Sequence, residues 1–382
     1  MAKKVVFVGL SGGVDSAVSA ALLKKQGYEV VGVFIKTWHP DFLECNEEEE
    51  RHDAMRVAAF LDIPFLTFNF EDVYKKEVAD YMIREYKAGR TPNPDVMCNK
   101  EVKFGAFLKK AVAMGADFVA TGHYAKNEKQ NPTPLTRGRL GGGELEYTSP
   151  QPSPYKGEGV MFNLRKGIDP SKDQSYFLWT LKQEQLKRIL FPVGHLNKNE
   201  VRKLAKKFHL PVAEKKDSQG ICFLGDVDLK KFLKHYIKEK KGRVVNEAGE
   251  EIGHHTGVVF HTLGERHGFT ITKKSPDDGP YYVVAKDIKK NILIVSQNKD
   301  SFHSKVLTNI RIENVSWINK IPEQNKTYTA QIRYHGEFLP CQIKIINKET
   351  TEIIFQKPML VASGQSVVMY DEYICLGGGV VK

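Results

Sequence analysis

A chain of 382 residues, 41% of them hydrophobic, is long enough for roughly two or three globular domains. No run approaches the ~18 apolar residues of a membrane span, and no signal or transit pattern precedes the first apolar run, so a cytoplasmic protein without a membrane partner is expected. The formal net charge of +11 favours a polyanionic partner such as a nucleic acid. Five cysteines without a C-x-x-C pair argue against a disulfide scaffold, a zinc ribbon and an iron–sulfur cluster.

Strand and helix signals alternate over the first third of the chain. Apolar runs predict strands over Val5–Leu10, Val30–Ile35, Phe65–Phe68 and Phe118–Ala120, and amphipathic runs predict helices over Val14–Gln26, Glu47–Leu61, Asp72–Tyr86 and Glu101–Met114. Gly27 is the expected C-terminal cap of the first helix. Because the strands are apolar throughout, the βαβα series predicts an α/β fold with a doubly wound parallel sheet.

Residues 127–159 interrupt this alternation. They are rich in Pro, Gly, Ser and Thr, a composition that cannot bury enough apolar surface to offset the entropy of ordering it, so they predict a disordered surface insertion. Beyond the insertion, capping boxes formed by Thr180 with Gln183 and by Asn197 with Glu200 predict two helix starts.

The second half of the chain changes from helical to β signals. A basic amphipathic run over 229–240 predicts a helix, and the turn signal at 246–249 with alternating runs at 328–332 and 342–346 predicts antiparallel hairpins. We therefore expect three domains: an N-terminal α/β domain over 1–225, a small mixed middle domain over 226–300, and a C-terminal β-barrel over 301–382.

The hexapeptide Ser11-Gly12-Gly13-Val14-Asp15-Ser16 lies between the first predicted strand and the first predicted helix. A glycine-rich loop at this junction exposes backbone N–H groups at the positive end of the helix dipole, which is a phosphate-binding arrangement. The loop lacks the Lys of a Walker A motif and the G-x-G-x-x-G spacing of dinucleotide folds. It resembles instead the loop of enzymes that split ATP between the α and β phosphates, a group that includes tRNA thiolases, GMP synthetase and argininosuccinate synthetase.

A second loop carries acid–base and nucleophilic side chains. Residues 89–100 hold Asn93, Pro94, Asp95 and Cys98, and two prolines stiffen the loop. If a helix begins near Asp95, the carboxylate and the thiol share one face. An Asp serves as a general acid or base, and a Cys serves as a nucleophile once it is a thiolate.

A third loop, over 217–225, places Cys222 between Gly220 and Gly225. Lys215 and Lys216 could lower the pKa of this cysteine if the fold brings them close. Either cysteine taken alone is more often a small buried hydrophobe, but two such loops in one chain indicate thiol chemistry.

Seven motifs occur in a fixed order along the chain: SGGVDS, TPNPDVMCNKEVKFG, ATGHY, KDQSYFLW, DSQGICFLG, RYHG and SGQSVVMYD. The same motifs in the same order are found in the tRNA-specific 2-thiouridylase family, which the chain resembles from Val5 to Gly378. The resemblance implies an N-terminal domain like the adenine nucleotide alpha hydrolases, a tRNA-binding middle domain and a C-terminal β-barrel.

The resemblance also implies a reaction. The enzyme would use ATP and Mg²⁺ to adenylate the C2 oxygen of the wobble uridine (position 34) in tRNAs for Lys, Glu and Gln. Sulfur would then replace that oxygen, with release of AMP and pyrophosphate. The implied partners are tRNA and a sulfur donor, such as a cysteine desulfurase or a sulfur-relay protein.

Site residues follow from the same resemblance. Cys222 would carry the sulfur as a persulfide, Cys98 would resolve it and leave a Cys98–Cys222 disulfide, and Asp95 would act on the uracil. ATP would contact Gly9, Leu10, Ser11, Gly12, Gly13, Val14, Asp15, Ser16, the backbone at Ile35, and Gly122. The target base would contact Asn93, Pro94 and Asp95, and the remaining tRNA contacts would be His123, Lys172, Asp173, Gln174, Arg333, Tyr334 and Gln365.

Two other functions stay open at this point. A synthetase of the same loop group with a small acid or purine substrate leaves both cysteine loops unexplained. A catalytically silent tRNA-binding protein leaves the phosphate loop, Asp95 and both cysteines without a use. The histidines show no metal-ligand spacing, so no metal site is expected in the protein. Without the resemblance, His123 reads more often as a satisfied histidine at a strand end.

Overall fold

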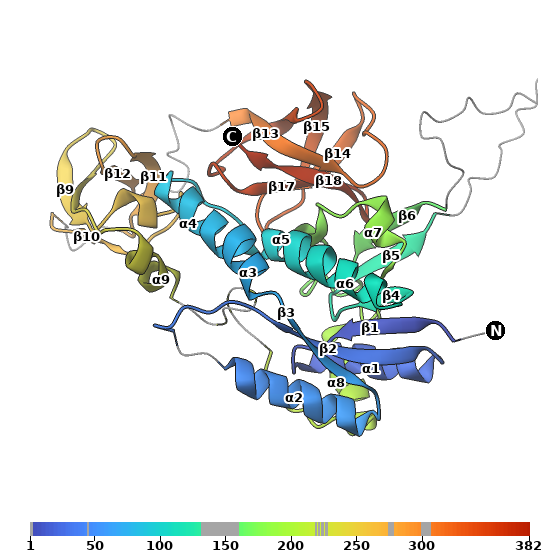
Figure 1. Ribbon diagram of the computed structural model, residues 1–382. Coiled ribbons are helices and arrows are strands. Elements are labelled where there is room, and N and C mark those ends of the chain that lie inside the picture. The colour runs from blue at the N-terminus through green and yellow to red at the C-terminus, as the bar shows by residue number, and fades with distance from the viewer. Residues whose placement is uncertain are drawn as a thin grey trace, which may run out of the picture.

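The computed structural model describes residues 3–43, 46–130, 160–217, 228–273, 279–298 and 307–382, together with Gly220, Cys222 and Gly225. Three sheets organise these residues, and Figure 1 shows them as three bodies that meet around the middle of the molecule.

The first sheet is a doubly wound parallel sheet, as predicted. Its strands are in the order β3-β2-β1-β4-β7, and every pairing between them is parallel. The strands are β1 (Val5–Gly9), β2 (Glu29–Lys36), β3 (Phe65–Asn69), β4 (Phe118–Ala120) and β7 (Ile189–Leu190). β2 and β3 follow β1 on one side of it, and β4 and β7 lie on its other side. The direction of the strand order therefore switches between β1 and β4. Such a switch point is where open α/β sheets bind ligands.

Helices cover both faces of this sheet (Figure 1). One layer holds α1 (Val14–Lys25), α2 (Glu47–Phe60) and α8 (Lys198–Lys207). The other holds α3 (Glu71–Tyr74), η1 (Lys75–Ala79), α4 (Asp80–Lys87), α5 (Pro94–Met97), η2 (Cys98–Phe107) and α6 (Leu108–Ala113). Successive side chains of β1 pack on opposite faces of the sheet. Val6 and Val8 belong to one buried cluster, and Phe7 belongs to the other.

Two predicted helices differ from the observed ones. Both η1 and η2 are π-helices, which interrupt the α-helical runs. The helix expected to begin at Glu101 begins instead at Pro94, because the Asn93 side chain caps it by accepting a hydrogen bond from the Val96 N–H at 3.2 Å. Cys98 is therefore inside a helical segment.

The middle sheet has the order β10-β9-β8-β12-β11 and follows α9 (Leu229–Tyr236). Its elements are β8 (Gly242–Val245), β9 (Glu251–His255), η4 (Val258–Phe260), β10 (Phe269–Ile271), β11 (Tyr282–Asp287) and β12 (Ile292–Ser296). The turn predicted at 246–249 joins β8 to β9, with Gly249 at a φ of +84°.

The C-terminal strands form a closed antiparallel barrel, because β13 pairs with both β16 and β18. The strands are β13 (Leu307–Trp317), β14 (Thr327–Gln331), β15 (Leu339–Ile345), β16 (Thr350–Met359), β17 (Ser366–Asp371) and β18 (Ile374–Val381). A hairpin from the N-terminal part of the chain, β5 (Ala125–Lys129) and β6 (Phe162–Lys166), extends this sheet through the pairing of Arg165 with Ile374.

That hairpin corrects the prediction for residues 127–159, since 127–129 belong to strand β5. The remainder of the predicted disordered insertion, 131–159, lies outside the described residues. Between β6 and α8 lie η3 (Ser175–Leu178) and α7 (Gln183–Leu186). Lys182, not Thr180, is the N-cap of α7, whereas the predicted capping box of Asn197 with Glu200 is confirmed at α8.

One buried cluster crosses all three bodies. Phe107 of η2, Phe232 of α9 and Tyr370 of β17 belong to the same hydrophobic core. This shared core fixes the barrel and the middle sheet against the face of the parallel sheet that carries α5 and η2. Within the described ranges, no helix is long and apolar enough to cross a membrane.

Candidate active site

The phosphate loop connects β1 to α1 at the switch point of the parallel sheet. Gly12 has a φ of +69°, and a Cβ at this position would lie 2.4 Å from the Glu50 carbonyl oxygen. Within the loop, Ser16 Oγ accepts from the Ser11 N–H at 3.2 Å and donates to the Gly13 carbonyl at 3.1 Å. These two bonds tie Ser16, at the start of α1, to both ends of the glycine pair.

Gly122 follows β4 and packs directly against the start of α1. A Cβ there would lie 2.8 Å from both the Asp15 carbonyl carbon and the Ser16 nitrogen. Ile35 is near the end of β2, on the other side of β1. The structure thus gathers at one edge of the sheet all the residues expected at the nucleotide: Gly9, Leu10, Ser11, Gly12, Gly13, Val14, Asp15, Ser16, Ile35 and Gly122.

The Asp15 carboxylate takes part in a network that the sequence did not predict. It accepts a hydrogen bond from the Tyr124 hydroxyl at 2.7 Å and two from Lys198 Nζ at 2.7 and 2.9 Å. Burial and the nearby Asp15 carboxylate raise the pKa of Tyr124, which therefore remains a hydroxyl donor.

Asp217, at the start of the Cys222 loop, belongs to the same network. Its carboxylate oxygens form ion pairs with Lys198 Nζ at 2.9 Å, with Lys172 Nζ at 2.9 Å and with an Arg202 guanidinium nitrogen at 2.6 Å. Burial acts to raise the pKa of Asp217, but the hydrogen bonds from Lys172 and Lys198 outweigh it and lower the pKa to about 2.

The two predicted cysteines meet. Cys98 is fully buried at the first residue of η2, Cys222 is partly buried, and neither forms a disulfide. The Cys98 thiol donates to Cys222 Sγ at an Sγ–Sγ distance of 3.4 Å, although 124 residues separate the two in sequence.

The peptide groups of Cys222 are held from two sides. Its backbone N–H donates to Asp95 Oδ1 at 2.8 Å, and its carbonyl accepts from the hydroxyl of the fully buried Tyr74 at 2.8 Å. Burial raises the pKa of Asp95, and the Cys222 N–H opposes that effect. Asp95 and Tyr74 thus fix the sulfur of Cys222 beside that of Cys98.

Lys103 supplies the positive charge at this thiol pair. In a π-helix the hydrogen bonds span five residues, so Lys103 lies about one turn beyond Cys98 on the same side, whereas an α-helix would rotate it roughly 140° away. The Cys98 hydrogen bond lowers the pKa of Cys222 against the effect of burial, and the Lys103 ammonium lowers it further. Burial raises the pKa of Cys98. Both pKa shifts favour a Cys222 thiolate that accepts from a Cys98 thiol.

Lys215 does not act on Cys222 as the sequence suggested. Its Nζ bonds instead to the buried Asp53 carboxylate at 2.6 Å. The ammonium that acts on Cys222 belongs to Lys103, five residues after Cys98, a spacing that points to the thiol only if the helix is a π-helix.

The barrel reaches the Asn93 loop from the opposite side. The Thr91 N–H donates to the Ser363 carbonyl at 2.8 Å, two residues before Gln365, whose side chain accepts from the Ala362 N–H. The ring of Tyr334, which follows Arg333, packs on the ring of Phe177, with 4.4 Å between the ring centroids. Burial, with the carboxylates of Asp173 and Asp95 nearby, raises the pKa of Tyr334 to about 12.

The other residues expected at tRNA make internal bonds. Lys172 binds Asp217, Asp173 accepts from Gly167 N–H and from Ser175, and the Gln174 side chain accepts from the Tyr124 N–H at 3.0 Å. His123 is buried between Phe104 and Phe191, with Nδ1 2.7 Å from Thr121 Oγ1. Burial and the Lys103 charge lower its pKa well below the usual range, so the imidazole is neutral.

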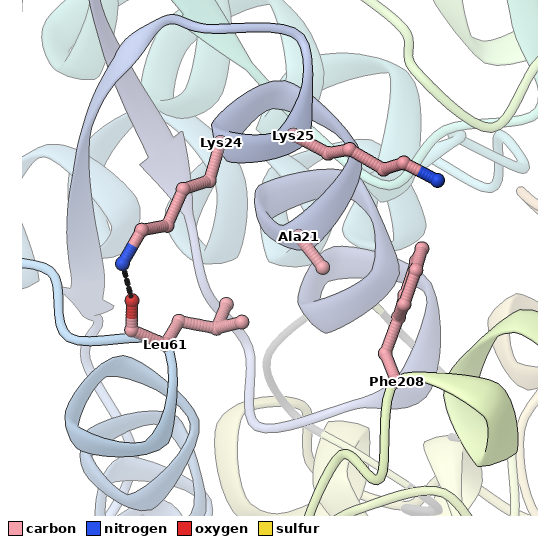
Figure 2. A pocket seen from close by; sticks show the side chains of 5 residues that line it. All are labelled: Ala21, Lys24, Lys25, Leu61 and Phe208. Carbon is pink, nitrogen blue, oxygen red and sulfur yellow. Dashed lines mark hydrogen bonds between the residues drawn. The ribbon is translucent and has the colours of Figure 1, made fainter.

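A surface hollow lies elsewhere. Figure 2 shows it lined by Ala21, Lys24, Lys25, Leu61 and Phe208, at the C-terminal ends of α1, α2 and α8. Because α1 has 12 residues, this hollow is roughly 18 Å from the phosphate loop along the helix axis. It is therefore distinct from the site of the cysteines.

We expect Lys103→Met to raise the pKa of Cys222, because the thiolate loses its adjacent ammonium. The measurement is the rate of Cys222 alkylation by iodoacetamide as a function of pH, resolved from other thiols by peptide mass spectrometry. The midpoint should move to higher pH. Lys100→Met removes an exposed ammonium paired with Glu101 on the same helix and should leave the midpoint in place. An unmoved midpoint in Lys103→Met would contradict the assigned thiolate.

Gly122→Ala should weaken ATP binding about tenfold or more, because the new methyl group displaces the start of α1 and its N–H groups. Equilibrium dialysis with ATP measures the effect. Gly279→Ala is the matched control, since a Cβ there meets no atom within 4 Å. Equal affinity of the two variants would show that Gly122 is not part of the nucleotide cradle.

Comparisons with known proteins match three successive parts of the chain to family models. Residues 4–226 match the family model described as tRNA methyl transferase HUP domain, 230–297 the tRNA methyl transferase PRC-barrel domain, and 307–381 the aminomethyltransferase beta-barrel domain. A curated relative from Neisseria meningitidis, named tRNA-specific 2-thiouridylase MnmA, is 44% identical over 99% of this chain and 95% of its own length.

Relatives of the same name have similar coverage. The protein from Streptococcus thermophilus is 42% identical over 99% of this chain and 95% of its own length, and that from Nitrosomonas europaea is 42% identical over 100% and 99%. The family resemblance inferred from the seven motifs is thus confirmed, and the chain belongs to the tRNA-specific 2-thiouridylase family.

Proposed function

We propose that this enzyme thiolates the C2 position of the wobble uridine in tRNAs for Lys, Glu and Gln, with ATP as the activating substrate. The observation that carries the proposal is the Cys98–Cys222 pair at 3.4 Å, beside Asp95. The pair is linked to the phosphate loop, because Lys198 pairs with both Asp15 of that loop and Asp217, five residues before Cys222. The name of the curated relatives, tRNA-specific 2-thiouridylase, supports tRNA as the substrate. The net charge of +11 suits a polyanionic partner.

Activation of the uracil is the first step. The C2 oxygen is a poor leaving group, so it attacks the α-phosphorus of ATP and expels pyrophosphate, after which AMP is the leaving group. The N–H groups of the loop and the α1 dipole stabilise the charge on the phosphates. Asp95, with Asn93 and Pro94 at the start of α5, would position the uracil and exchange its proton.

Sulfur transfer is the second step. A persulfide on Cys222 attacks C2 through its terminal sulfur, AMP leaves, and a C2–S–S–Cys222 linkage remains. The Cys98 thiolate then attacks Cys222 Sγ, so that the Cys98–Cys222 disulfide forms as the thiouridine is released. In the described state Cys98 already contacts the atom it would attack. A thiol reductant restores both cysteines, and a cysteine desulfurase or relay protein reloads Cys222.

Magnesium fits this site through the phosphates. Among the residues that the structure describes, no group of three or more His, Cys, Asp or Glu side chains could hold a metal ion. Since Mg²⁺ in nucleotide sites takes one or two carboxylates with phosphate oxygens and water, Asp15 at the loop would contribute the carboxylate. The ion would neutralise charge on the departing pyrophosphate.

The remaining tRNA contacts are proposed on position. Arg333, Tyr334 and Gln365 would contact tRNA from barrel loops near the Asn93 loop, since Thr91 bonds the Ser363 carbonyl and Tyr334 packs on Phe177. Lys172, Asp173 and Gln174 would contact it from the turn after β6, and the buried His123 is proposed with them on the family resemblance alone. We also propose the domain division at 1–225, 226–300 and 301–382, and a cytoplasmic location that accords with a tRNA substrate.

The test is nucleoside mass spectrometry on tRNA incubated with the protein, ATP, Mg²⁺ and a persulfide source. Replacement of one oxygen by sulfur at the wobble uridine is expected. Cys222→Ser should abolish thiolation but leave AMP formation measurable, because adenylation does not need the sulfur carrier. In Cys98→Ser the reaction should stop at the disulfide that joins the uridine to Cys222, and a thiol reductant should release the tRNA.

Cys341→Ala serves as the matched control, because this cysteine is buried in the barrel away from the pair. It should thiolate like the unmodified protein. Thiolation by Cys222→Ser would overturn the carrier assignment. AMP formation with a small acceptor and none with tRNA would support a small-molecule synthetase, and tRNA binding without AMP formation would support a silent binding protein.

A further inference from the structure

The middle body of the molecule, which consists of the middle sheet with α9 and η4, contacts the segment that leads into Asn93 and Asp95. Lys286 lies on β11, and its Nζ donates to the Gly89 carbonyl at 2.9 Å and to the His261 carbonyl at 2.6 Å. Gly89 precedes Asn93 by four residues in the sequence. One ammonium therefore joins the middle body to the N-terminal side of the loop that carries Asp95.

Further contacts lie along the same seam. Thr262 comes shortly after η4, and its Oγ1 lies 3.3 Å from Thr91 Oγ1. Ile288 follows β11 and covers Gly89, since a Cβ on Gly89 would lie 2.5 Å from Ile288 Cδ1. Gly89 has a φ of +75°, which glycine adopts without strain, so the middle body meets the chain at a turn. Separate segments of the middle body thus contact residues 89–91.

The supporting residues are themselves bonded within the middle body. Glu265 Oε2 accepts the Thr262 N–H at 3.0 Å, and Glu265 Oε1 pairs with Lys230 of α9. His261, whose carbonyl accepts from Lys286, is buried. The contacts with residues 89–91 therefore come from a fixed part of the middle body.

The barrel and α4 contact the same segment from other sides. The Thr91 N–H donates to the Ser363 carbonyl at 2.8 Å, and a Cβ on Gly364 would lie 2.9 Å from Arg90 Cβ. The Arg90 guanidinium donates to both carboxylate oxygens of Glu85 on α4, at 2.5 and 2.7 Å. The segment is thus held between the middle body, the barrel and α4, and Lys286 provides one side of this support.

A displacement of this segment would carry over to Asp95. Pro92 and Pro94 restrict the backbone on either side of Asn93, and the Asn93 side chain caps α5 by accepting from the Val96 N–H. Asp95 is the second residue of α5, so it moves with the start of that helix. A misplacement of about 1 Å in a reacting group costs up to ~100-fold in rate.

We infer that Lys286 is a positioning residue, through which the middle body sets the place of Asn93 and Asp95 and thereby the rate of base activation. The inference rests on the proposed function, in which Asp95 acts on the uracil. Lys286 acts through the Gly89 carbonyl and needs no contact with tRNA or ATP. The middle body therefore contributes to turnover in addition to any binding of tRNA.

The test is tRNA-dependent AMP formation by the full-length protein at saturating ATP, with kcat and the KM for tRNA determined separately. Lys286→Met should lower kcat roughly tenfold or more and leave the KM within about twofold, because Asp95 loses its placement while the tRNA contacts remain. Lys286→Arg should restore most of the rate, since a guanidinium can donate to both carbonyls. Lys289→Met removes an exposed ammonium from the same hairpin and should behave like the unmodified protein.

Hydrogen–deuterium exchange of residues 89–97 reports the support of the loop without tRNA or ATP. Exchange should be faster in Lys286→Met than in Lys289→Met, because the segment has lost one of its attachments. Circular dichroism checks that each variant is folded.

An unchanged kcat in Lys286→Met would overturn the inference, as would a loss confined to the KM for tRNA that Lys289→Met shares. An unmodified protein that forms no AMP with tRNA would instead contradict the proposed function. The exchange of residues 89–97 would still decide in that case whether Lys286 holds the loop, and equal exchange in the two variants would show that it does not.

Discussion

Everything at this site depends on holding Cys222 against Cys98. The chain entropy of bringing together residues 124 positions apart is on the order of 4 kcal/mol, which exceeds what one hydrogen bond between thiols contributes. The fold meets this cost through other contacts: α8 packs on α1, Asp217 is bound by three cations, and Asp95 and Tyr74 hold the Cys222 peptide. The sulfur contact is the result of that scaffold, not its cause.

The same scaffold shifts the pKa values of the two cysteines in opposite directions. Cys98 is fully buried, which favours its thiol, while Cys222 accepts from that thiol and is bonded by Lys103, which favours its thiolate. A sulfur carrier must be a nucleophile to be loaded, since the thiolate is the reactive form. A resolving cysteine that stays protonated does not attack prematurely. In the proposed reaction, one ammonium and one difference in burial would therefore distinguish the sulfur carrier from the resolving cysteine.

Local features of the site could be predicted from the sequence, and features that depend on helix register or on distant pairing could not. The turn at Gly12 and the helix cap at Asn93 are formed by residues close together in sequence, so a local motif is enough to predict each of them. Lys103 lies on the side of the thiols because η2 is a π-helix. The pattern of apolar residues did not predict a π-helix at this position. The strands β5 and β6 looked polar because they pair at the edge of the barrel sheet, and their partner β18 lies at the end of the chain.

Asp95 connects the state of the thiol loop to the state of the substrate. Its Oδ1 accepts the Cys222 N–H, so while the pair is closed this oxygen is committed to the protein. In the proposed function, a uracil bound at this carboxylate would compete with the Cys222 N–H for it. Burial also raises the pKa of Asp95, and loss of the Cys222 N–H would remove a bond that favours its charged form. In the proposed function, the carboxylate that holds the Cys222 peptide would also meet the uracil, so one side chain would couple the position of the sulfur carrier to the binding of the base.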